Sequence, residues 1–270
     1  MSEPELKPVD LTVVGSINVD FTLRMQTLPR PGETVPAYQF VRAPGGKGAN
    51  QAVAAARLGA RVTIVGAVGE DQLAEEALVG LRAARVNLEV ERKAETGIAM
   101  IYVDGQGENE IAVYPGANAE LTPREVSGNV LCQLEVPDEV VLAAAAKADF
   151  FALNAAPARE LDVEPDLLVV NELEHEVFSR GRLVAVTRGK DGAALYENGE
   201  EIARSEAPLI QAQDATGAGD AFTGALVYTL LAGAPPENAL RFACTAGAWV
   251  AAQVGAQLAM PTLEDVFLWM

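Results

Sequence analysis

Short apolar runs alternate with stretches of helical periodicity along most of the chain. Runs typical of buried strands lie at residues 11–14, 62–65, 130–135, 150–153, 167–170 and 184–187. Helices are predicted at residues 51–58, 72–84 and 138–147, with another between 114 and 130, and the C-terminal part is predicted to hold a hairpin near 198–199 and helices near 220–231, 236–253 and after 261. Apolar strands that alternate with helices form a parallel sheet covered on both faces. The pattern therefore predicts an α/β fold with three layers, α/β/α, around a mainly parallel central sheet.

Two regions interrupt this alternation. Residues 21–43 are rich in proline and form two short extended pieces without a helical period. Residues 96–103 and 111–114 flank a polar loop, which is typical of a hairpin. We interpret about 21–43 and 96–114 as a small β-sheet that serves as a lid or an oligomer contact, within a single domain that spans residues 1–270.

The heptapeptide Asp214-Ala-Thr-Gly-Ala-Gly-Asp220 precedes an apolar helical run. Glycines that enter a helix leave backbone N–H groups unshielded, and with the helix dipole these groups bind anions. The charge of Asp220 would repel such an anion, so one interpretation gives this residue a role in proton transfer. The alternative is that Asp220 compensates the helix dipole as an ordinary first-turn residue.

A second glycine-rich segment, Gly45-Gly46-Lys47-Gly48-Ala49-Asn50, opens the helix that is predicted to end at Gly59. It is not a Walker A loop, because Lys47 is followed by glycine rather than by Ser or Thr. Nor is the first strand followed by the Gly-x-Gly-x-x-Gly of dinucleotide enzymes. The adjacent glycines let a small ligand approach the backbone, with Lys47 and Asn50 facing the same space.

Polar residues stand repeatedly at the carboxyl ends of the predicted strands. They are Asn18 and Asp20, Glu135, Asn154, Asn171 with Glu174, and Thr187 with Gly189. Open α/β sheets bind ligands at that edge, so the sequence predicts a ligand site there. Asn18 and Asp20 point the same way in an extended segment, which suits polyol recognition, although an Asx-rich turn explains the pair equally well.

Composition narrows the class of ligand. The net charge of −18 and the pI near 4.4 argue against a nucleic acid partner. Cys132 and Cys244 have neither a disulfide nor a metal-site pattern, which fits a cytoplasmic setting, and we expect neither a signal peptide nor a membrane span. The lone histidine, His175, lies between Glu174 and Glu176 and is expected at the solvated surface, which disfavours histidine-based catalysis.

Three motifs resemble the signature elements of the ribokinase-type (PfkB) carbohydrate kinases. They are Gly45-Gly-Lys-Gly-Ala-Asn-Gln-Ala52, Asn171-Glu-Leu-Glu174 and Asp214-Ala-Thr-Gly-Ala-Gly-Asp-Ala-Phe222. The resemblance covers residues 11–262, and Tyr114-Pro-Gly-Ala-Asn118 and Gly255-Ala-Gln257 belong to it as well. It implies a kinase that transfers the γ-phosphoryl group of ATP to the O5 hydroxyl of D-ribose, with Mg²⁺ and a monovalent cation, K⁺, as cofactors.

The resemblance also implies roles by position. Asp220 would be the general base toward the sugar hydroxyl, and the N–H groups of Gly217, Ala218 and Gly219 would stabilise the transferred phosphoryl group. The implied sugar-binding residues are Asn18, Asp20, Gly46, Lys47, Asn50, Glu135 and Asp220. The implied nucleotide-binding residues are Asn171, Thr187, Gly189 and Gly219, with Glu174 on the Mg²⁺ side. The implied K⁺ site contains Asp214, Thr216 and Gly255.

The chain departs from the family pattern at two places. Ala259 stands where a serine often completes the K⁺ site. Only residues 175–182 separate Glu174 from the next predicted strand, where the family usually has a longer helical excursion. We therefore expect activity to persist with an altered affinity for the nucleotide.

The resemblance implies a homodimer, because in relatives the lid sheet pairs with that of a second subunit. Two other functions stay open. The acceptor of the same kinase could be deoxyribose, a ketohexose or a nucleoside, selected by lid residues near Phe40, Ile98 and Met100. A non-catalytic sugar or nucleotide sensor on this scaffold is disfavoured by Asp220 and Glu174, because a protein that only binds needs no base.

Overall fold

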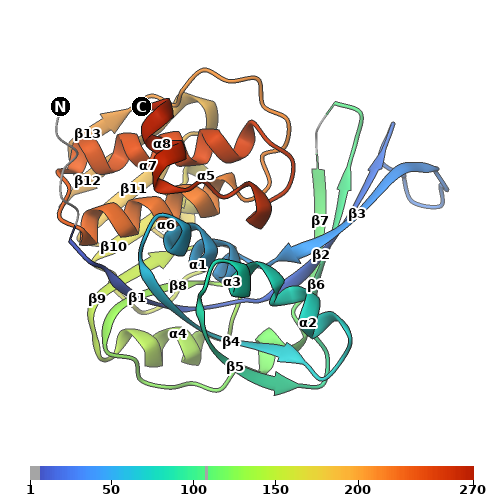
Figure 1. Ribbon diagram of the computed structural model, residues 1–270, viewed down its shortest axis with the longest axis horizontal. Coiled ribbons are helices and arrows are strands. Elements are labelled where there is room, and N and C mark those ends of the chain that lie inside the picture. Colours follow the sequence, from blue (N-terminus) through green and yellow to red (C-terminus); the bar gives the residue numbers. More distant parts are fainter. Residues whose placement is uncertain (1–6, 107–108) are drawn as a thin grey trace.

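The computed structural model describes residues 7–106 and 109–270, which form two sheets with helices around the larger one (Figure 1). The central sheet has nine strands in the order β13 (Glu200–Ser205), β12 (Ala193–Glu197), β11 (Leu183–Thr187), β10 (Leu167–Asn171), β9 (Ala148–Asn154), β8 (Gly128–Gln133), β1 (Asp10–Val14), β4 (Arg61–Gly69) and β5 (Asn87–Lys93). The strands from β11 to β5 pair in parallel, and β12 and β13 add the predicted antiparallel hairpin. The prediction of a mainly parallel sheet is confirmed.

Helices cover both faces of this sheet. One face carries α1 (Lys47–Arg57), α2 (Leu73–Ala77), α3 (Val79–Ala83), α6 (Ala218–Leu231), α7 (Pro236–Ala251) and α8 (Leu263–Trp269), and the other carries α4 (Asp138–Ala145) and α5 (Glu172–Val177). Successive strand residues point to opposite faces, so Val13 and Val14 are both buried but belong to different cores. The three layers predicted from the sequence are therefore present.

Three details differ from the prediction. The strand β5 was missed, because its sequence NLEVERK carries four charged residues and only two large apolar ones, as suits a sheet edge. The helix expected at residues 72–84 is divided at Leu78 into α2 and α3. The helix expected between residues 114 and 130 is only a 3-10 turn, η1 (Gly116–Glu120), which follows Pro115 and begins at a glycine with φ of +49°.

The second sheet projects beside the main body (Figure 1) and has the order β3 (Ala37–Gly45), β2 (Asn18–Met25), β6 (Gly97–Val103) and β7 (Asn109–Tyr114). The strands β6 and β7 form the predicted hairpin, although residues 107–108 of its loop lie outside the described residues. The strand β2 begins at Asn18, so Asn18 and Asp20 belong to this small sheet. In the described part of the chain, no helix is long and apolar enough to cross a membrane.

Candidate active site

The glycine-rich segment before α1 brings the start of this helix against the end of β1. A Cβ atom on Gly48 would lie 2.6 Å from the backbone of Gly15 and Ser16, so only glycine fits there. The Ala49 N–H donates to the Ser16 carbonyl at 2.9 Å, and Gly46 has a φ of +89°, which also favours glycine. The first turn of α1 thereby sits at the carboxyl edge of the sheet.

Asp220 lies in the first turn of α6, whose N-cap is Gly217 with φ of +80°. Its carboxylate is buried and accepts hydrogen bonds from Asn50 Nδ2 and Gln51 Nε2, each at 2.9 Å. An ionised carboxylate only accepts, so two amide donors hold both of its oxygens in fixed directions. The Ala218 N–H donates to the Ala215 carbonyl at 3.1 Å, so this member of the predicted anion site takes part in a turn.

A chain of side-chain amides supports this carboxylate. Gln51 Nε2 also donates to Asn154 Oδ1 at 2.9 Å, and Gln51 Oε1 accepts from Gln133 Nε2 at 2.6 Å. On the other side, Gln257 Nε2 donates to Asn50 Oδ1 at 3.0 Å. All five amide side chains are buried, so their orientations are coupled through these bonds. The sequence analysis assigned no role to Gln51 or Gln133. For Gln51 the available signal was a polar residue within an alanine-rich run, and for Gln133 a polar residue at the end of a buried strand.

Lys47 is the cation at the centre of the site. Burial acts to lower its pKa, but the carboxylates of Asp220, Glu135, Glu174 and Asp20 together raise the pKa of Lys47 above its ordinary value. The structure therefore brings these four acids, which are spread over 200 residues of sequence, around one ammonium group. In a protein with net charge −18, the Lys47 ammonium is the positive side chain that an anionic substrate would meet beside these carboxylates.

The ionisation of Asp20, one of the carboxylates around Lys47, is strongly perturbed. Burial raises the pKa of Asp20 to about 7, the charges of Glu135 and Asp220 raise it further, and the charge of Lys47 partly offsets both effects. Asp20 is therefore only partly ionised near neutral pH when the site holds no ligand.

Two neighbouring side chains orient the remaining predicted sugar-binding groups. Glu135 Oε2 accepts from Ser16 Oγ at 2.5 Å and from the Lys47 N–H at 3.1 Å. Asn18 Oδ1 accepts from Asn118 Nδ2 at 2.7 Å, and Asn118 also bonds the backbone of Ile17. Ser16 and Asn118 had not been assigned roles from the sequence.

The predicted nucleotide-side residues gather at the far end of the same edge. A cavity of about 150 Å³ is lined in part by Lys47, Asn171, Glu174, Thr187, Gly219 and Asp220. Asn171 and Glu174 form a capping box at the start of α5, with both of its bonds at 2.8 Å. One oxygen of Glu174 is engaged in this box. Gly189, with φ of +54°, follows β11 at the same edge and does not line the cavity.

The residues implied for a K⁺ site lie near one another but are differently engaged. Asp214 Oδ1 accepts from the Thr216 N–H at 3.0 Å, and Asp214 Oδ2 accepts from Arg24 Nη2, also at 3.0 Å. The Asp214 N–H reaches the carbonyl of Ala251 at the end of α7, four residues before Gly255. Asp214 therefore contacts a guanidinium group of the small sheet.

A larger hollow of about 810 Å³ lies at the opposite edge of the sheet, around the start of β1 and β4. It contains none of the predicted site residues, and its wall includes the exposed ion pair between Asp10 and Arg61. This hollow is therefore separate from the candidate site, which lies at the edge that holds Asp220 and Lys47.

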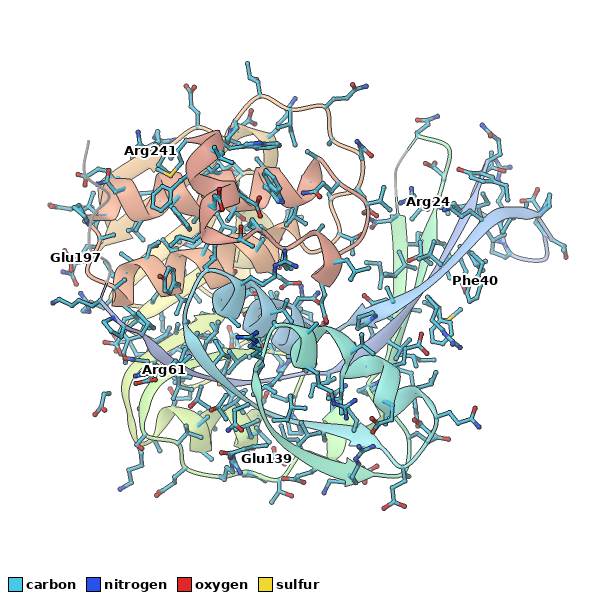
Figure 2. All side chains as sticks on the ribbon, viewed as in Figure 1. Arg24, Phe40, Arg61, Glu139, Glu197 and Arg241 are labelled. Carbon is cyan, nitrogen blue, oxygen red and sulfur yellow. The ribbon has the colours of Figure 1, made fainter. Side chains whose placement is uncertain are left out.

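The lid residues expected to select the acceptor do not lie on the face of the small sheet that carries Asn18 and Asp20. In the pleated sheet, Phe40 pairs with Leu23, Met100 with Phe21 and Ile98 with Val19. These side chains lie on the face opposite Asn18 and Asp20. Arg24, on the face of Asp20, and Phe40 accordingly lie on opposite sides of the small sheet (Figure 2). Residues on the inner face include Ala99, which pairs with Asp20, and Val113, which lines a cavity of about 360 Å³ with Asn18 and Glu135.

Comparison with known proteins defines the class. The pfkB family carbohydrate kinase model matches residues 9–156 and 136–263. Ribokinase of Bacillus subtilis (strain 168) is 35% identical over 288 aligned residues, which cover 95% of this chain and 98% of that protein. The structure of ribokinase from Thermotoga maritima aligns with a TM-score of 0.84 at 30% identity, covering 97% of this chain and 99% of that one. Arabidopsis thaliana ribokinase, in complex with ribose and ATP, aligns with a TM-score of 0.81 at 29% identity, covering 97% and 99%.

The chain therefore belongs to the pfkB family of carbohydrate kinases, as the three motifs indicated. It is an ATP-dependent sugar kinase with the ribokinase-like fold.

Proposed function

We propose that this chain transfers the γ-phosphoryl group of ATP to the O5 hydroxyl of D-ribose. The observation that carries the proposal is the buried Asp220 carboxylate, held by two amide donors in the first turn of a helix that begins at a glycine. A carboxylate in an anion site needs a chemical reason, and removal of a hydroxyl proton supplies one. If Asp220 only compensated the helix dipole, the two buried amide donors of Asn50 and Gln51 would have no explanation.

The sugar is bound, in this proposal, by the polar groups on and below the start of β2. Asn18, Asp20 and Glu135 accept hydrogen bonds from hydroxyl groups, and Lys47, Asn50 and the backbone of Gly46 complete the site. The bonds from Asn118 to Asn18 and from Ser16 to Glu135 hold two acceptors in place before the sugar arrives. Little reorganisation is then needed on binding.

The chemical step needs a base and a place for negative charge. Asp220 accepts the proton of the O5 hydroxyl as the oxygen attacks the γ-phosphorus, the bond to the β-phosphate oxygen breaks and ADP leaves. The N–H groups of Gly217 and Gly219 stabilise the equatorial oxygens, and the Ala218 N–H joins them when it exchanges its turn bond for one to the phosphoryl group. Lys47 contributes positive charge beside Asp220.

Asn171, Thr187 and Gly189 bind the nucleotide phosphates in this proposal, together with Gly219. The residues present fit a Mg²⁺ ion that is held chiefly by those phosphates, because the capping box leaves the second carboxylate oxygen of Glu174 available as a ligand. Mg²⁺, when bound with ATP, neutralises charge on the transferred group. The groups around Asp214 do not fit a K⁺ ion, since the Arg24 guanidinium at 3.0 Å already places a positive charge on this carboxylate and would repel the cation, and Ala259 supplies no side-chain oxygen.

We further propose that the small sheet excludes water from the sugar and mediates a homodimer in the cytoplasm. Its two edge strands expose large apolar side chains to solvent, with Ile111 and Val113 on the face of Asp20 and Phe40 and Tyr114 on the opposite face, and Tyr38 is exposed as well. Exposed apolar side chains gathered on one small sheet are typical of a protein contact. A sedimentation mass of one chain at micromolar concentration would contradict the dimer.

The cytoplasmic location in this proposal rests on the cysteines. Both cysteines are buried and unpaired, which fits a reducing compartment.

Deoxyribose is the second candidate acceptor, because deoxyribokinase of Salmonella typhi is 30% identical over 95% of this chain. The test is ADP release with Mg-ATP and ribose, deoxyribose, fructose or adenosine. We expect turnover with ribose, and expect Asp220→Asn to lower kcat by about 10²–10⁴-fold while ribose still binds. Asp265→Asn, which removes a capping carboxylate of α8 instead, is the matched control. Full activity of Asp220→Asn would refute the proposed base.

A further inference from the structure

The small sheet and the phosphoryl-binding loop are joined by one ion pair. Arg24 of β2 donates to Asp214 at 3.0 Å, and the two residues are 190 positions apart in the sequence. Their side chains are only 19% and 14% exposed, less than in the other ion pairs of the described residues, of which Lys93 with Glu91 comes next at 23% and 32%. A guanidinium group is always protonated and is more weakly hydrated than an ammonium, so it suits such a sheltered position.

The position of Asp214 beside the proposed phosphoryl site favours a positive charge that compensates its carboxylate. Asp214 stands three residues before Gly217, where the proposed function places the phosphoryl group. An uncompensated carboxylate at this distance along the loop would repel the polyphosphate. The family resemblance implies K⁺ as the compensating charge, yet Arg24 occupies one oxygen of Asp214 and Ala259, which is buried, offers none.

We propose that the Arg24 guanidinium neutralises Asp214 in place of a monovalent cation, and that phosphoryl transfer by this chain is independent of K⁺. The departure from the family pattern at Ala259 then has an explanation: a cation ligand is absent because the Arg24 side chain supplies the charge. This inference rests on the proposed function. Arg24 is a positioning residue, because it acts on the anion site through Asp214.

The ion pair has a second consequence for the same site. Asn18, Asp20 and Arg24 occupy alternate positions on β2 and share one face of the small sheet. The strand that carries sugar-binding groups is therefore fixed to the loop that carries the anion site. An inorganic cation would complete the anion site without making this connection to the sheet.

The first test compares turnover in KCl and in tetramethylammonium chloride at equal ionic strength. We expect wild-type turnover to be the same in the two salts within about twofold. We expect Arg24→Ala to lower kcat at least about tenfold, Arg24→Lys to keep more activity than Arg24→Ala, and Arg30→Ala, which removes an exposed arginine of the same region, to have no effect. Severalfold stimulation of the wild type by K⁺, or full activity of Arg24→Ala in both salts, would overturn the proposal.

A second readout does not depend on turnover. The melting temperature of the wild type should be equal in the two salts, and a rise specific to K⁺ would reveal a bound cation and refute the proposal. If no acceptor is phosphorylated in either salt, the proposed function fails while the melting comparison still decides whether K⁺ binds. If Arg24→Ala fails to fold, the wild-type salt comparisons and Arg24→Lys carry the test.

Discussion

Ionisation of Asp20 works against folding, so replacement of Asp20 by asparagine should stabilise the protein at alkaline pH. The pKa of this carboxyl rises from an ordinary value of 3.8 to about 7 in the folded protein, mainly through burial. A shift of one pKa unit corresponds to about 1.4 kcal/mol, so three units cost on the order of 4 kcal/mol once Asp20 is ionised in both states. Asparagine keeps the shape of the side chain and carries no charge.

The sign of the pH dependence follows from proton binding. Between pH 4 and 7 the folded protein holds the Asp20 proton and the unfolded chain does not. Wild-type stability therefore falls as pH rises through this window, and the loss is complete above pH 7. The variant lacks this loss. Its advantage over wild type should grow by about 3 kcal/mol between pH 5 and pH 8.

Urea unfolding without ligand, followed by the fluorescence of Trp249 and Trp269, measures this difference at pH 5, 6, 7 and 8. Asp71→Asn is the control of opposite sign. Burial acts to raise the pKa of Asp71, but hydrogen bonds from Thr96, Ala74 and Leu73 lower it below its ordinary value. That variant should lose stability relative to wild type above pH 4. An Asp20→Asn advantage that is the same at every pH would refute the reasoning.

Three further predictions concern the same site. Gly48→Ala should lower the free energy of unfolding by about 1–3 kcal/mol, because its Cβ would lie 2.6 Å from the backbone of Gly15. Gly219→Ala should leave the free energy of unfolding unchanged, because a Cβ at Gly219 would meet no atom within 4 Å, and thermal melting compares the two variants. Gln51→Leu should lower kcat about tenfold with little change in KM for ATP, since Asp220 loses one of its two donors; unchanged kcat in steady-state kinetics would contradict this. The KM for ribose should fall as pH rises through about 7, because an ionised Asp20 carboxylate accepts hydroxyl hydrogen bonds more strongly, and with both oxygens, than its protonated form does. A flat profile between pH 6 and 9 would exclude that role.

The sequence was most informative where local pattern and local structure coincide. The buried strands were predicted, and so were the helix starts that follow the glycines at positions 45–48 and 217–219. Both kinds of element have short-range sequence signatures. The edge strand β5 was not predicted, since four of its seven residues carry charge. Local pattern thus identified the centre of the sheet better than its rim.

Contacts between distant segments could not be predicted in the same way. The bond from Gln51 to Asp220 and the pair of Arg24 with Asp214 each join residues more than 160 positions apart. The spacing of Gln51 and Arg24 in the sequence does not indicate which residue each one contacts. The opposite orientation of Phe40 depends on strand register, because its pairing with Leu23 sets it on the face opposite Asp20.

The buried amide of Gln51 also offers a way to observe the reaction. Its two N–H hydrogens are committed to Asp220 and Asn154, and its oxygen to Gln133, so the group has a single orientation. In a nitrogen-15 NMR spectrum, the two hydrogens should differ widely in chemical shift and exchange slowly with solvent. Proton transfer to Asp220 would move one of them and leave the other nearly unchanged. A neutral side chain beside the carboxylate thus becomes a reporter of its charge, without any label on sugar or nucleotide.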